Sequence, residues 1–216
     1  MFNRFKRQDR PSRINSGELI TLPQPVLDSK TSIEAALQER RSIRDYTPES
    51  LSISEISQLL WAAQGITRLG GYRTAPSAGA LYPLEVYLVS GQVDDLAAGI
   101  YRYSPEDHGL HLVLTGDFRE DLSAAALGQD AIRNAPAVIV ITGVFERTTV
   151  KYGNRGIQYV HMEVGSAAEN VYLQAESLGL GTVFIGAFHD DRVSQLLNLD
   201  GQEQPLCIMP VGKSRH

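Results

Sequence analysis

Apolar and polar positions recur along the chain with two different periods, and these periods predict where helices and strands lie. The clearest helical pattern runs from residue 157 to residue 178, where apolar side chains recur every three or four positions. These positions are Ile157, Val160, Val164, Ala167, Ala168, Val171, Ala175 and Leu178. Gly179 follows, at the place where a left-handed residue commonly ends a helix. We therefore expect one long helix that crosses the core.

Shorter helices are predicted at four other places. Ser52 and Glu55 form a capping-box pattern in front of apolar residues at helical spacing, so a helix should run from there to about Gly65. Ile33 and Leu37 indicate an amphipathic helix shortly before, and residues 117–127 have helical spacing as well. The run from His189 to Asp191 should begin a further helix with Asp190 as its cap.

Strands are predicted where β-branched and aromatic residues cluster between turn residues. The predicted strands cover residues 84–90, 100–103, 110–114, 137–142, 182–185 and 206–211. Residues 105–109 should join the second and third of these strands as a hairpin, which suggests an antiparallel section. Helices and strands interleave without a repeat, so the predicted class is α+β with one central sheet.

Length and charge limit the protein classes that fit. The chain has 216 residues, 43% of them hydrophobic, and a formal charge of −5. We expect a basic, proline-interrupted arm over residues 1–30 and a single domain over residues 31–216. No apolar run approaches the ~20 residues that span a bilayer, and no secretion signal follows the basic start, so we expect a soluble, cytoplasmic protein with no membrane partner. The negative charge argues against nucleic acid as the main partner.

A cluster of cations marks the end of the first predicted helix. Arg40, Arg41, Ser42 and Arg44 stand within five positions. Guanidinium groups keep their charge and bind phosphate oxygens in pairs, so the cluster predicts a phosphate site. The alternative is a solvated helix end, because cations near the last turn are favoured by the helix dipole.

Two stretches of small residues are candidates for close approach to a ligand. Residues 73–83 contain Pro76, Ser77, Ala78 and Gly79, which should form a rigid loop with exposed amide groups. The other interpretation is a plain surface turn. Residues 179–188 form the second stretch, which lacks the strand–glycine–helix order of a dinucleotide fingerprint.

Several other reactive side chains are assigned no chemistry. Cys207 lies in an apolar run and should be a buried structural thiol. His161, Glu163 and Glu169 lack the spacing of a helical metal site, so no metal is predicted. Ser77 has no histidine near it in sequence, which argues against a hydrolytic triad.

Five motifs in order carry a resemblance to a known family. They are Arg-Arg-Ser-x-Arg, Pro-Ser-Ala-Gly-Ala-Leu-Tyr-Pro, Lys-Tyr-Gly-x-Arg-Gly, Gly-Leu-Gly-x-x-x-Ile-Gly-Ala-Phe and Pro-Val-Gly. With these motifs the chain resembles the FMN-dependent nitroreductase superfamily, in particular its SagB and ThcOx type dehydrogenases, and the resemblance runs from about Gly17 to Gly212. The resemblance implies a mostly antiparallel sheet flanked by helices and an intertwined homodimer that binds FMN at its interface.

The resemblance also implies roles for residues. Arg40, Arg41 and Ser42 would hold the FMN phosphate and ribityl chain, and Arg44 would lie near the pyrimidine edge of the ring. The loop residues Pro76, Ser77, Ala78 and Gly79 would contact the flavin from the partner subunit. The backbone at Ile185, Gly186 and Ala187 would face N5 and O4. Gln129 matches a position that bonds the polar edge of the flavin, although a solvated helix-end glutamine is the alternative.

Two departures from the family pattern concern charge and catalysis. The chain stops at His216, so only Lys213 and Arg215 follow the Pro-Val-Gly motif to supply the usual C-terminal phosphate ligands. Lys151 and Tyr152 match the pair that azoline-oxidising members use to remove a ring proton. A lysine acts as a base near neutral pH only when it is desolvated or crowded by cations, and a surface lysine beside a packing tyrosine is the alternative.

The sequence therefore predicts an FMN-dependent oxidoreductase that transfers hydride through flavin N5. The donor would be NAD(P)H or an oxidisable heterocycle, and the acceptor a quinone, a nitroaromatic or dioxygen. The alternatives are an azoline-to-azole peptide dehydrogenase, which would act on a peptide heterocycle, and a flavin-binding protein without turnover.

Overall fold

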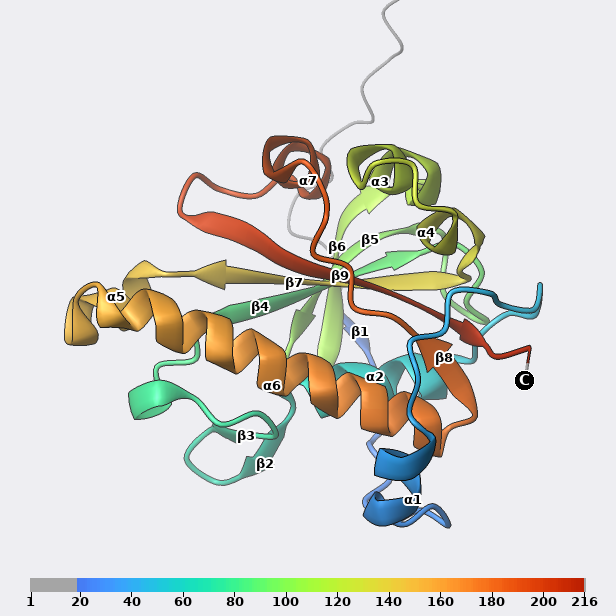
Figure 1. The fold of residues 1–216 in the computed structure, drawn as a ribbon, viewed down its shortest axis with the longest axis horizontal. Helices are drawn as coiled ribbons and strands as arrows, with labels where there is room; N and C mark the ends of the chain where they lie inside the picture. Colours follow the sequence, from blue (N-terminus) through green and yellow to red (C-terminus); the bar gives the residue numbers. More distant parts are fainter. Residues whose placement is uncertain (1–18, 216) are drawn as a thin grey trace, which may run out of the picture.

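The computed structural model describes residues 19–215, which form a seven-stranded sheet with helices on both faces (Figure 1). The strand order is β1-β6-β5-β4-β7-β9-β8, and every neighbouring pair is antiparallel. The strands are β1 (Leu19–Thr21), β4 (Leu84–Ser90), β5 (Gly99–Ser104), β6 (Gly109–Thr115), β7 (Ala137–Val144), β8 (Leu180–Thr182) and β9 (Glu203–Lys213). The predicted α+β class with a central antiparallel sheet is confirmed.

Helices cover the two faces in two groups. On one face lie α1 (Ile33–Glu39), α2 (Ile53–Gln64) and α6 (Arg155–Ser177), and on the other lie α3 (Arg119–Ala125), α4 (Asp130–Asn134) and α7 (Asp190–Leu197) (Figure 1). The helix α5 (Glu146–Tyr152) precedes α6, the strands β2 (Ile66–Arg68) and β3 (Tyr72–Arg73) form a small hairpin, and the single-turn helix η1 (Ala78–Ala80) follows it.

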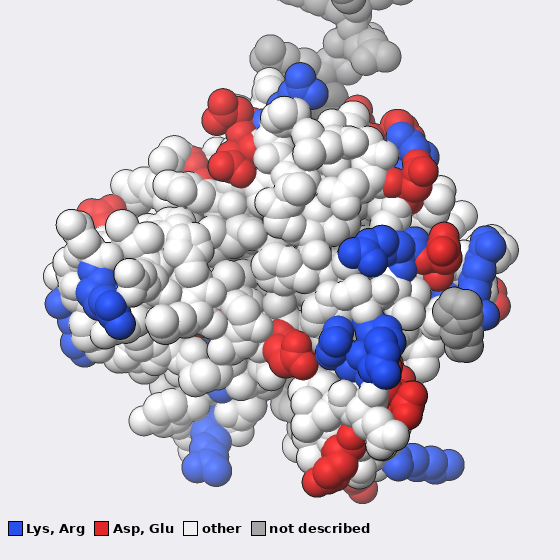
Figure 2. Space-filling model, viewed as in Figure 1, with Lys and Arg blue, Asp and Glu red and all other residues white. Residues whose placement is uncertain are grey.

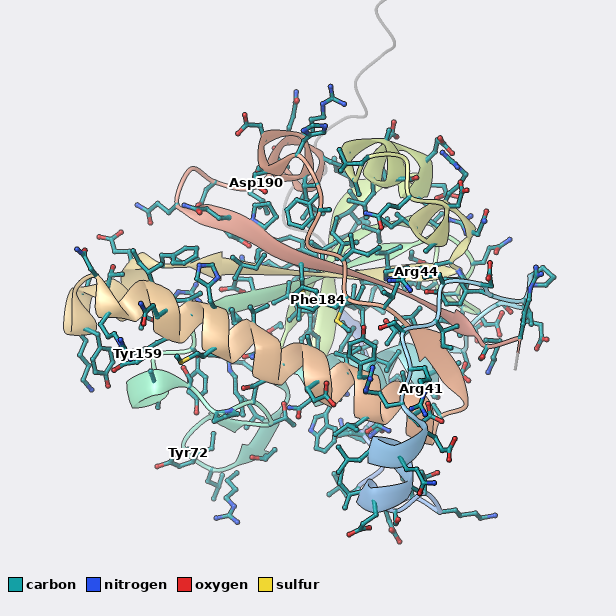
Figure 3. All side chains as sticks on the ribbon, in the orientation of Figure 1. Arg41, Arg44, Tyr72, Tyr159, Phe184 and Asp190 are labelled. Carbon is teal, nitrogen blue, oxygen red and sulfur yellow. The ribbon has the colours of Figure 1, made fainter. Side chains whose placement is uncertain are left out.

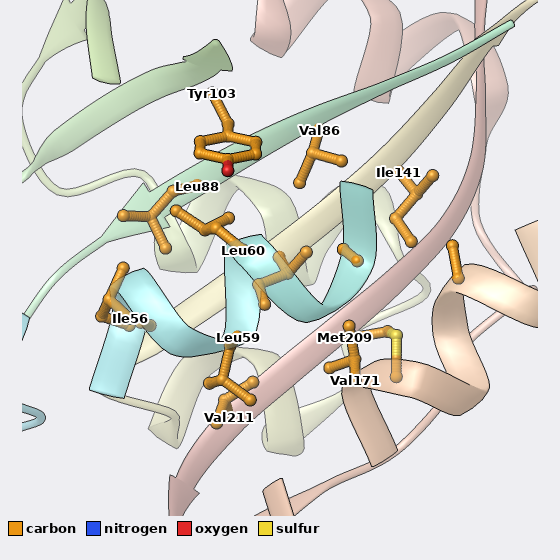
Figure 4. Close-up of a cluster of buried hydrophobic side chains, with 14 of the residues drawn as sticks. Ile56, Leu59, Leu60, Val86, Leu88, Tyr103, Ile141, Val171, Met209 and Val211 are labelled. Carbon is orange, nitrogen blue, oxygen red and sulfur yellow. The ribbon is translucent and has the colours of Figure 1, made fainter. Parts of the chain in front are cut away.

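The central strands are buried on both faces, which explains their unbroken apolar sequence. Along β7, Ile139 and Ile141 join the core beneath α2 and α6, whereas Val138 and Val140 join the core beneath α3, α4 and α7. Figure 4 shows the first of these cores, where α2 contributes Leu60 against the sheet. Successive side chains of β7 point to opposite faces of the sheet, so this one strand contributes to both cores.

The long helix and the capping box are confirmed. Ser52 and Glu55 bond reciprocally at the start of α2, and Gly179 has the left-handed φ of +68° expected after α6. Two details of the helix predictions were wrong. Ile157 is 43% exposed, because the first turn of α6 carries it away from the core, and the N-cap of α7 is His189, which leaves Asp190 as the first helical residue.

The predicted strand over residues 182–185 was displaced. The strand β8 ends at Thr182, and of the next three residues only Ile185 pairs with the sheet, through a bridge to Ile208. The cause is a side chain, because Phe184 N–H donates to the Tyr172 hydroxyl at 2.7 Å instead of to a strand. The chain therefore leaves the sheet edge at this point, and Phe184, Gly186 and Ala187 are exposed.

The amphipathic helix α1 does not direct its large apolar residues into the core. Ile33 and Leu37 are each 55% exposed, and only Ala36 is buried. Part of the predicted arm, residues 1–18, lies outside the described residues, and β1 and the buried Leu22 lie within the remainder. Within residues 19–215, no helix is long and apolar enough to cross a membrane.

Candidate active site

The arginine cluster lies in an extended segment that runs beside β8. Arg40 is the C-cap of α1, and Ser42 pairs with Thr182 as a parallel bridge in which Ile43 N–H donates to Thr182 O at 2.9 Å. Gly181 permits this close approach, because a Cβ on it would meet Ile43 at 2.6 Å. The backbone therefore fixes the cluster against the sheet edge.

The guanidinium groups of this segment lie apart from the carboxylates of the described residues. Arg40 stacks over the Tyr172 ring at 5.0 Å, and Arg41 donates only to the carbonyls of Gln38 and Arg40. Within residues 19–215, none of the three arginines pairs with a carboxylate. Blue side chains stand out in Figure 2 where Figure 3 labels Arg41 and Arg44. Unpaired cations beyond the helix end fit an anion better than a helix dipole.

Tyr172 organises this region, and the sequence analysis missed it. Its hydroxyl lies 3.2 Å from Ser42 Oγ and accepts the Phe184 N–H, so one side chain of α6 connects the arginine segment with the segment after β8. Tyr172 follows Val171 in the apolar pattern of the long helix, so the sequence predicts only that it packs in the core. The one available signal was its hydroxyl, because a buried tyrosine hydroxyl usually has a hydrogen-bond partner.

The segment after β8 presents free amide groups. Ile185 exchanges two backbone hydrogen bonds with Ile208, whereas the N–H groups of Gly186 and Ala187 are exposed and have no partner among the described residues. Gln129, the N-cap of α4, donates from Nε2 to Ala187 O at 3.1 Å. The structure thus brings Gln129 next to the predicted amide donors.

The two C-terminal cations are engaged within the chain. Lys213 forms an ion pair with Glu55, which lowers the pKa of that carboxyl despite its partial burial. Arg215 Nε donates to Tyr46 O at 2.9 Å. Both residues adjoin Tyr46, two positions after Arg44, so they lie at the edge of the arginine cluster rather than unpaired within it.

A second region is built on the small-residue loop around η1. Gly79, Ala80 and Tyr82 have φ values of +64°, +54° and +46°, which side chains rarely adopt. Ser77 Oγ accepts the Tyr82 N–H at 2.9 Å, and Ser77 O accepts the Ala80 N–H at 3.1 Å. The loop is therefore a fixed, strained turn rather than a plain surface turn.

Lys151 and Tyr152 lie directly against this loop. A Cβ on Gly79 would meet the Tyr152 hydroxyl at 2.7 Å and Lys151 Nζ at 2.9 Å. Lys151 is exposed in the single chain, and the two arginines nearest to it in sequence are engaged elsewhere. Arg147 pairs with Glu85, and Arg155 stacks over Tyr159 at 5.7 Å. The predicted base thus adjoins the predicted flavin loop.

Beneath the loop, α6 contributes a buried carboxyl. Glu163 is 3% exposed, and one of its oxygens, Oε1, has no partner among the described residues. Burial raises its pKa to about 7, although the hydrogen bond from Ser77 and the charge of Arg73 act to lower it. The sequence analysis considered Glu163 only as a metal ligand and missed its burial.

The predicted site residues therefore form two separate regions of one chain. Tyr172 marks the arginine region and Glu163 marks the loop region, nine residues apart on α6. At 1.5 Å per residue these positions are about 14 Å apart along the helix. Figure 3 shows the separation, with Arg41 and Phe184 near the C-terminal half of α6 and Tyr159 near its N-terminal half.

Comparisons with known proteins agree with this fold. The nitroreductase family model matches residues 37–213. A nitroreductase-named protein of Methanocaldococcus jannaschii is 44% identical over 91% of this chain and 98% of its own length. The microcin B17-processing protein McbC of Escherichia coli is 34% identical over 75% of this chain, which spans only 62% of McbC.

Solved structures give the same result. A Ralstonia eutropha crystal structure named as a nitroreductase superposes with a TM-score of 0.81 and 32% identity, over 96% of this chain and 94% of the other. The E. coli microcin synthetase McbBCD complex with truncated pro-MccB17 contains a chain that superposes with a TM-score of 0.70 and 29% identity, over 91% and 78%. This chain belongs to the nitroreductase family of oxidoreductases, whose members generally bind FMN.

Proposed function

We propose that the protein is an FMN-dependent oxidoreductase whose two site regions come together only between the subunits of a homodimer. The observation that carries this proposal is the separation of the regions along α6. One region offers unpaired guanidinium groups and free amides, and the other offers a tight loop with an adjacent lysine and tyrosine. Neither region encloses a flavin by itself. A second chain would supply the missing half.

The arginine region fits the phosphate and polar parts of FMN. Arg40, Arg41 and Ser42 would bind the phosphate and ribityl chain, with Lys213 and Arg215 adding positive charge at the edge. Arg44 would stabilise negative charge at the pyrimidine side of the ring. The exposed N–H groups of Gly186 and Ala187 would donate to the ring edge, with Gln129 and Ile185 holding that segment in place.

The loop region would cover the flavin of the neighbouring subunit. Pro76, Ser77, Ala78 and Gly79 carry little side chain, so a flat ring can approach their backbone closely. Bound FMN would supply a hydride donor and acceptor at N5. The exposed apolar residues Ile157, Met162 and Phe184 lie on or beside α6, where a second chain would cover them. The proposal also takes residues 31–216 to form one FMN-binding domain. It places the protein in the cytoplasm.

A donor such as NAD(P)H and a quinone or nitroaromatic acceptor would use one pocket in turn. A second candidate is dehydrogenation of a peptide azoline, with dioxygen as the acceptor. The contact of Lys151 and Tyr152 with the flavin loop favours it, because a base there would stand beside the reacting ring. The similarity to McbC also favours it, although this chain spans only part of that protein.

The visible absorbance of freshly purified protein tests the cofactor, and turnover then separates the candidates. We expect a bound flavin spectrum, reduction by NADH or NADPH, and reoxidation by a quinone. Arg44→Ala should slow flavin reduction, because the fixed positive charge near the ring is lost. A colourless protein that takes up no FMN would contradict the proposal. Bound FMN that no donor reduces above the rate of free flavin would indicate a binding protein without turnover.

A further inference from the structure

A polar pocket lies beside the loop region and takes no part in the proposed function. It has a volume of about 530 Å³, and three guanidinium groups and two carboxylates line it, those of Arg73, Arg102, Arg147, Glu85 and Glu106. The three arginines come from β3, β5 and α5, so the fold brings them together from separate parts of the sequence. No single motif of the sequence marks this pocket.

The arginines of the pocket outnumber the carboxylates that pair with them. Glu85 is shared, because its Oε1 accepts from Arg147 at 2.6 Å while its Oε2 lies 3.0 Å from Arg102. Glu106 pairs with Arg73 at 3.3 Å. The lining therefore carries one positive charge that no lining carboxylate balances.

Arg102 is the cation with the most binding capacity left. Among residues 19–215 it pairs with one oxygen of Glu85, although a guanidinium group has five N–H donors, and its side chain is 46% exposed. The other two arginines have further partners. Arg147 also donates to Tyr82 O at 3.0 Å, and Arg73 also donates to Gln64 Oε1 at 2.9 Å.

A third carboxyl in the neighbourhood, that of Glu203, does not line the pocket. It is 8% exposed and accepts hydrogen bonds from the hydroxyls of Tyr87 and Thr142. Burial raises the pKa of Glu203, which favours its neutral form. Glu203 therefore leaves the positive charge at Arg102 available to a ligand.

We propose that this pocket binds a small organic carboxylate, which pairs with Arg102. One negative charge matches the unbalanced positive charge, whereas a phosphate dianion would add repulsion from Glu85 and Glu106. Leu81 and Pro105 line the same pocket and offer apolar contact to the body of such a ligand. The site goes beyond the proposed function, because it needs neither FMN nor a second chain.

The test titrates the isotope-labelled full-length protein with benzoate and follows the backbone amide resonances of Arg102 and His111. These residues are partners on β5 and β6, and both line the pocket. Benzoate should shift both resonances to saturation, whereas benzamide, which has nearly the same shape and no charge, should not. Inorganic phosphate, the rival anion, should bind more weakly. An absent or equal response to benzoate and benzamide would overturn the site, and tighter binding of phosphate would overturn the choice of a carboxylate.

Two variants should change the benzoate Kd in opposite directions. Arg102→Gln should weaken binding about 10-fold, because the charged hydrogen bonds are lost. Glu106→Gln should strengthen it about 2- to 3-fold, because this exposed carboxylate competes with the ligand for Arg73. Arg133→Gln removes exposed ion pairs on the other face of the sheet and should leave the Kd unchanged. Wild-type affinity in Arg102→Gln, or weaker binding in Glu106→Gln, would contradict the proposal.

A further titration keeps this pocket separate from the arginine region. In the variant that carries Arg40→Ala and Arg41→Ala, benzoate should bind with the wild-type Kd. Loss of the response at Arg102 and His111 in that variant would show that the anion acts from the arginine region, and would overturn the inference. A protein that binds no FMN but keeps the benzoate response would instead contradict only the proposed function.

Discussion

The two regions along α6 hold their residues by different physical means. At the arginine region, backbone pairing with β8 places Ser42, and no carboxylate among residues 19–215 pairs with Arg40 or Arg41. At the loop region, Gly79 has a positive φ, and a side chain at this position would collide with Tyr152 and Lys151. The charged group there, Lys151, lies beside the loop and not within it. In the proposed function, one region would attract an anion and the other would fit a flat ring. This difference is what a cofactor with a charged tail and a planar ring requires.

The largest expected effect comes from removing the anion-binding charge. Arg40→Ala combined with Arg41→Ala should weaken FMN binding by about 10²- to 10⁴-fold, since each charged hydrogen bond contributes about 1.5–3 kcal/mol. Fluorescence titration of flavin-free protein measures this. Arg133→Ala, which removes two exposed ion pairs on the other face of the sheet, is the matched control. An affinity within threefold of wild type would show that the anion site lies elsewhere.

The next effect concerns the loop region and turnover. If Lys151 is the base, Lys151→Gln should lower the rate of azoline oxidation by about 10²-fold or more, because general bases contribute 10²–10⁴. FMN affinity and quinone reduction should change little. Single-turnover rates with an azoline peptide measure the loss, and Lys30→Gln, at an exposed position, is the control. Equal rates for the two variants would leave Lys151 as a surface lysine.

A pH-dependent stability effect should follow from Glu163. Its pKa is about 7 when folded and near 4.5 when unfolded, so over this range the unfolded chain binds fewer protons. The free energy of unfolding of the wild type should therefore fall as pH rises from 4.5 to 7 and then level off. Glu163→Gln has no group that titrates here, so its free energy of unfolding should not fall in this way. Between pH 4.5 and pH 7 it should gain about 2 kcal/mol of stability relative to wild type, after a reduction for solvent screening. Urea unfolding at pH 5 and pH 8 measures it; parallel pH profiles would contradict it.

The smallest effect is steric. Gly79→Ala should destabilise the protein by about 1–2 kcal/mol, because a side chain is strained at φ +64° and its Cβ would press on Tyr152 and Lys151. Gly201→Ala is the control, since a Cβ there has no neighbour within 4 Å. Urea unfolding compares the two. Equal stabilities would mean that the loop relaxes freely and is not the rigid surface described above.

Much of the fold could be predicted from patterns of neighbouring residues. The capping box at Ser52, the long helix and the unbroken apolar strand β7 each follow from neighbouring residues, and each was found. The end of β8 was misplaced because the Tyr172 hydroxyl, a long-range partner, takes the Phe184 N–H. The cap of α7 was misplaced by one residue, since the His189 backbone and not the Asp190 side chain begins that helix.

In the candidate site, too, the sequence motifs could be predicted, whereas the contacts between distant segments could not. The arginine segment and the loop are visible as sequence motifs, so their residues could be named in advance. The grouping of Lys151 with Gly79 and the burial of Glu163 depend on how α5 and α6 pack against the loop. No spacing in the sequence encodes such packing. The separation of the two regions could only come from the structure.

The central claim is that each active site takes one region from each subunit, and mixed dimers test it most directly. A chain carrying Arg40→Ala and Arg41→Ala would be co-expressed with a differently tagged chain carrying Gly79→Leu, and the hybrid isolated by both tags. If the regions meet between subunits, one site of the hybrid is wholly native, so the hybrid should bind FMN at one site and recover half of the wild-type turnover, while each parent dimer stays inactive. A hybrid that binds no FMN and is as inactive as its parents would show that both regions act within one chain, and would contradict the account.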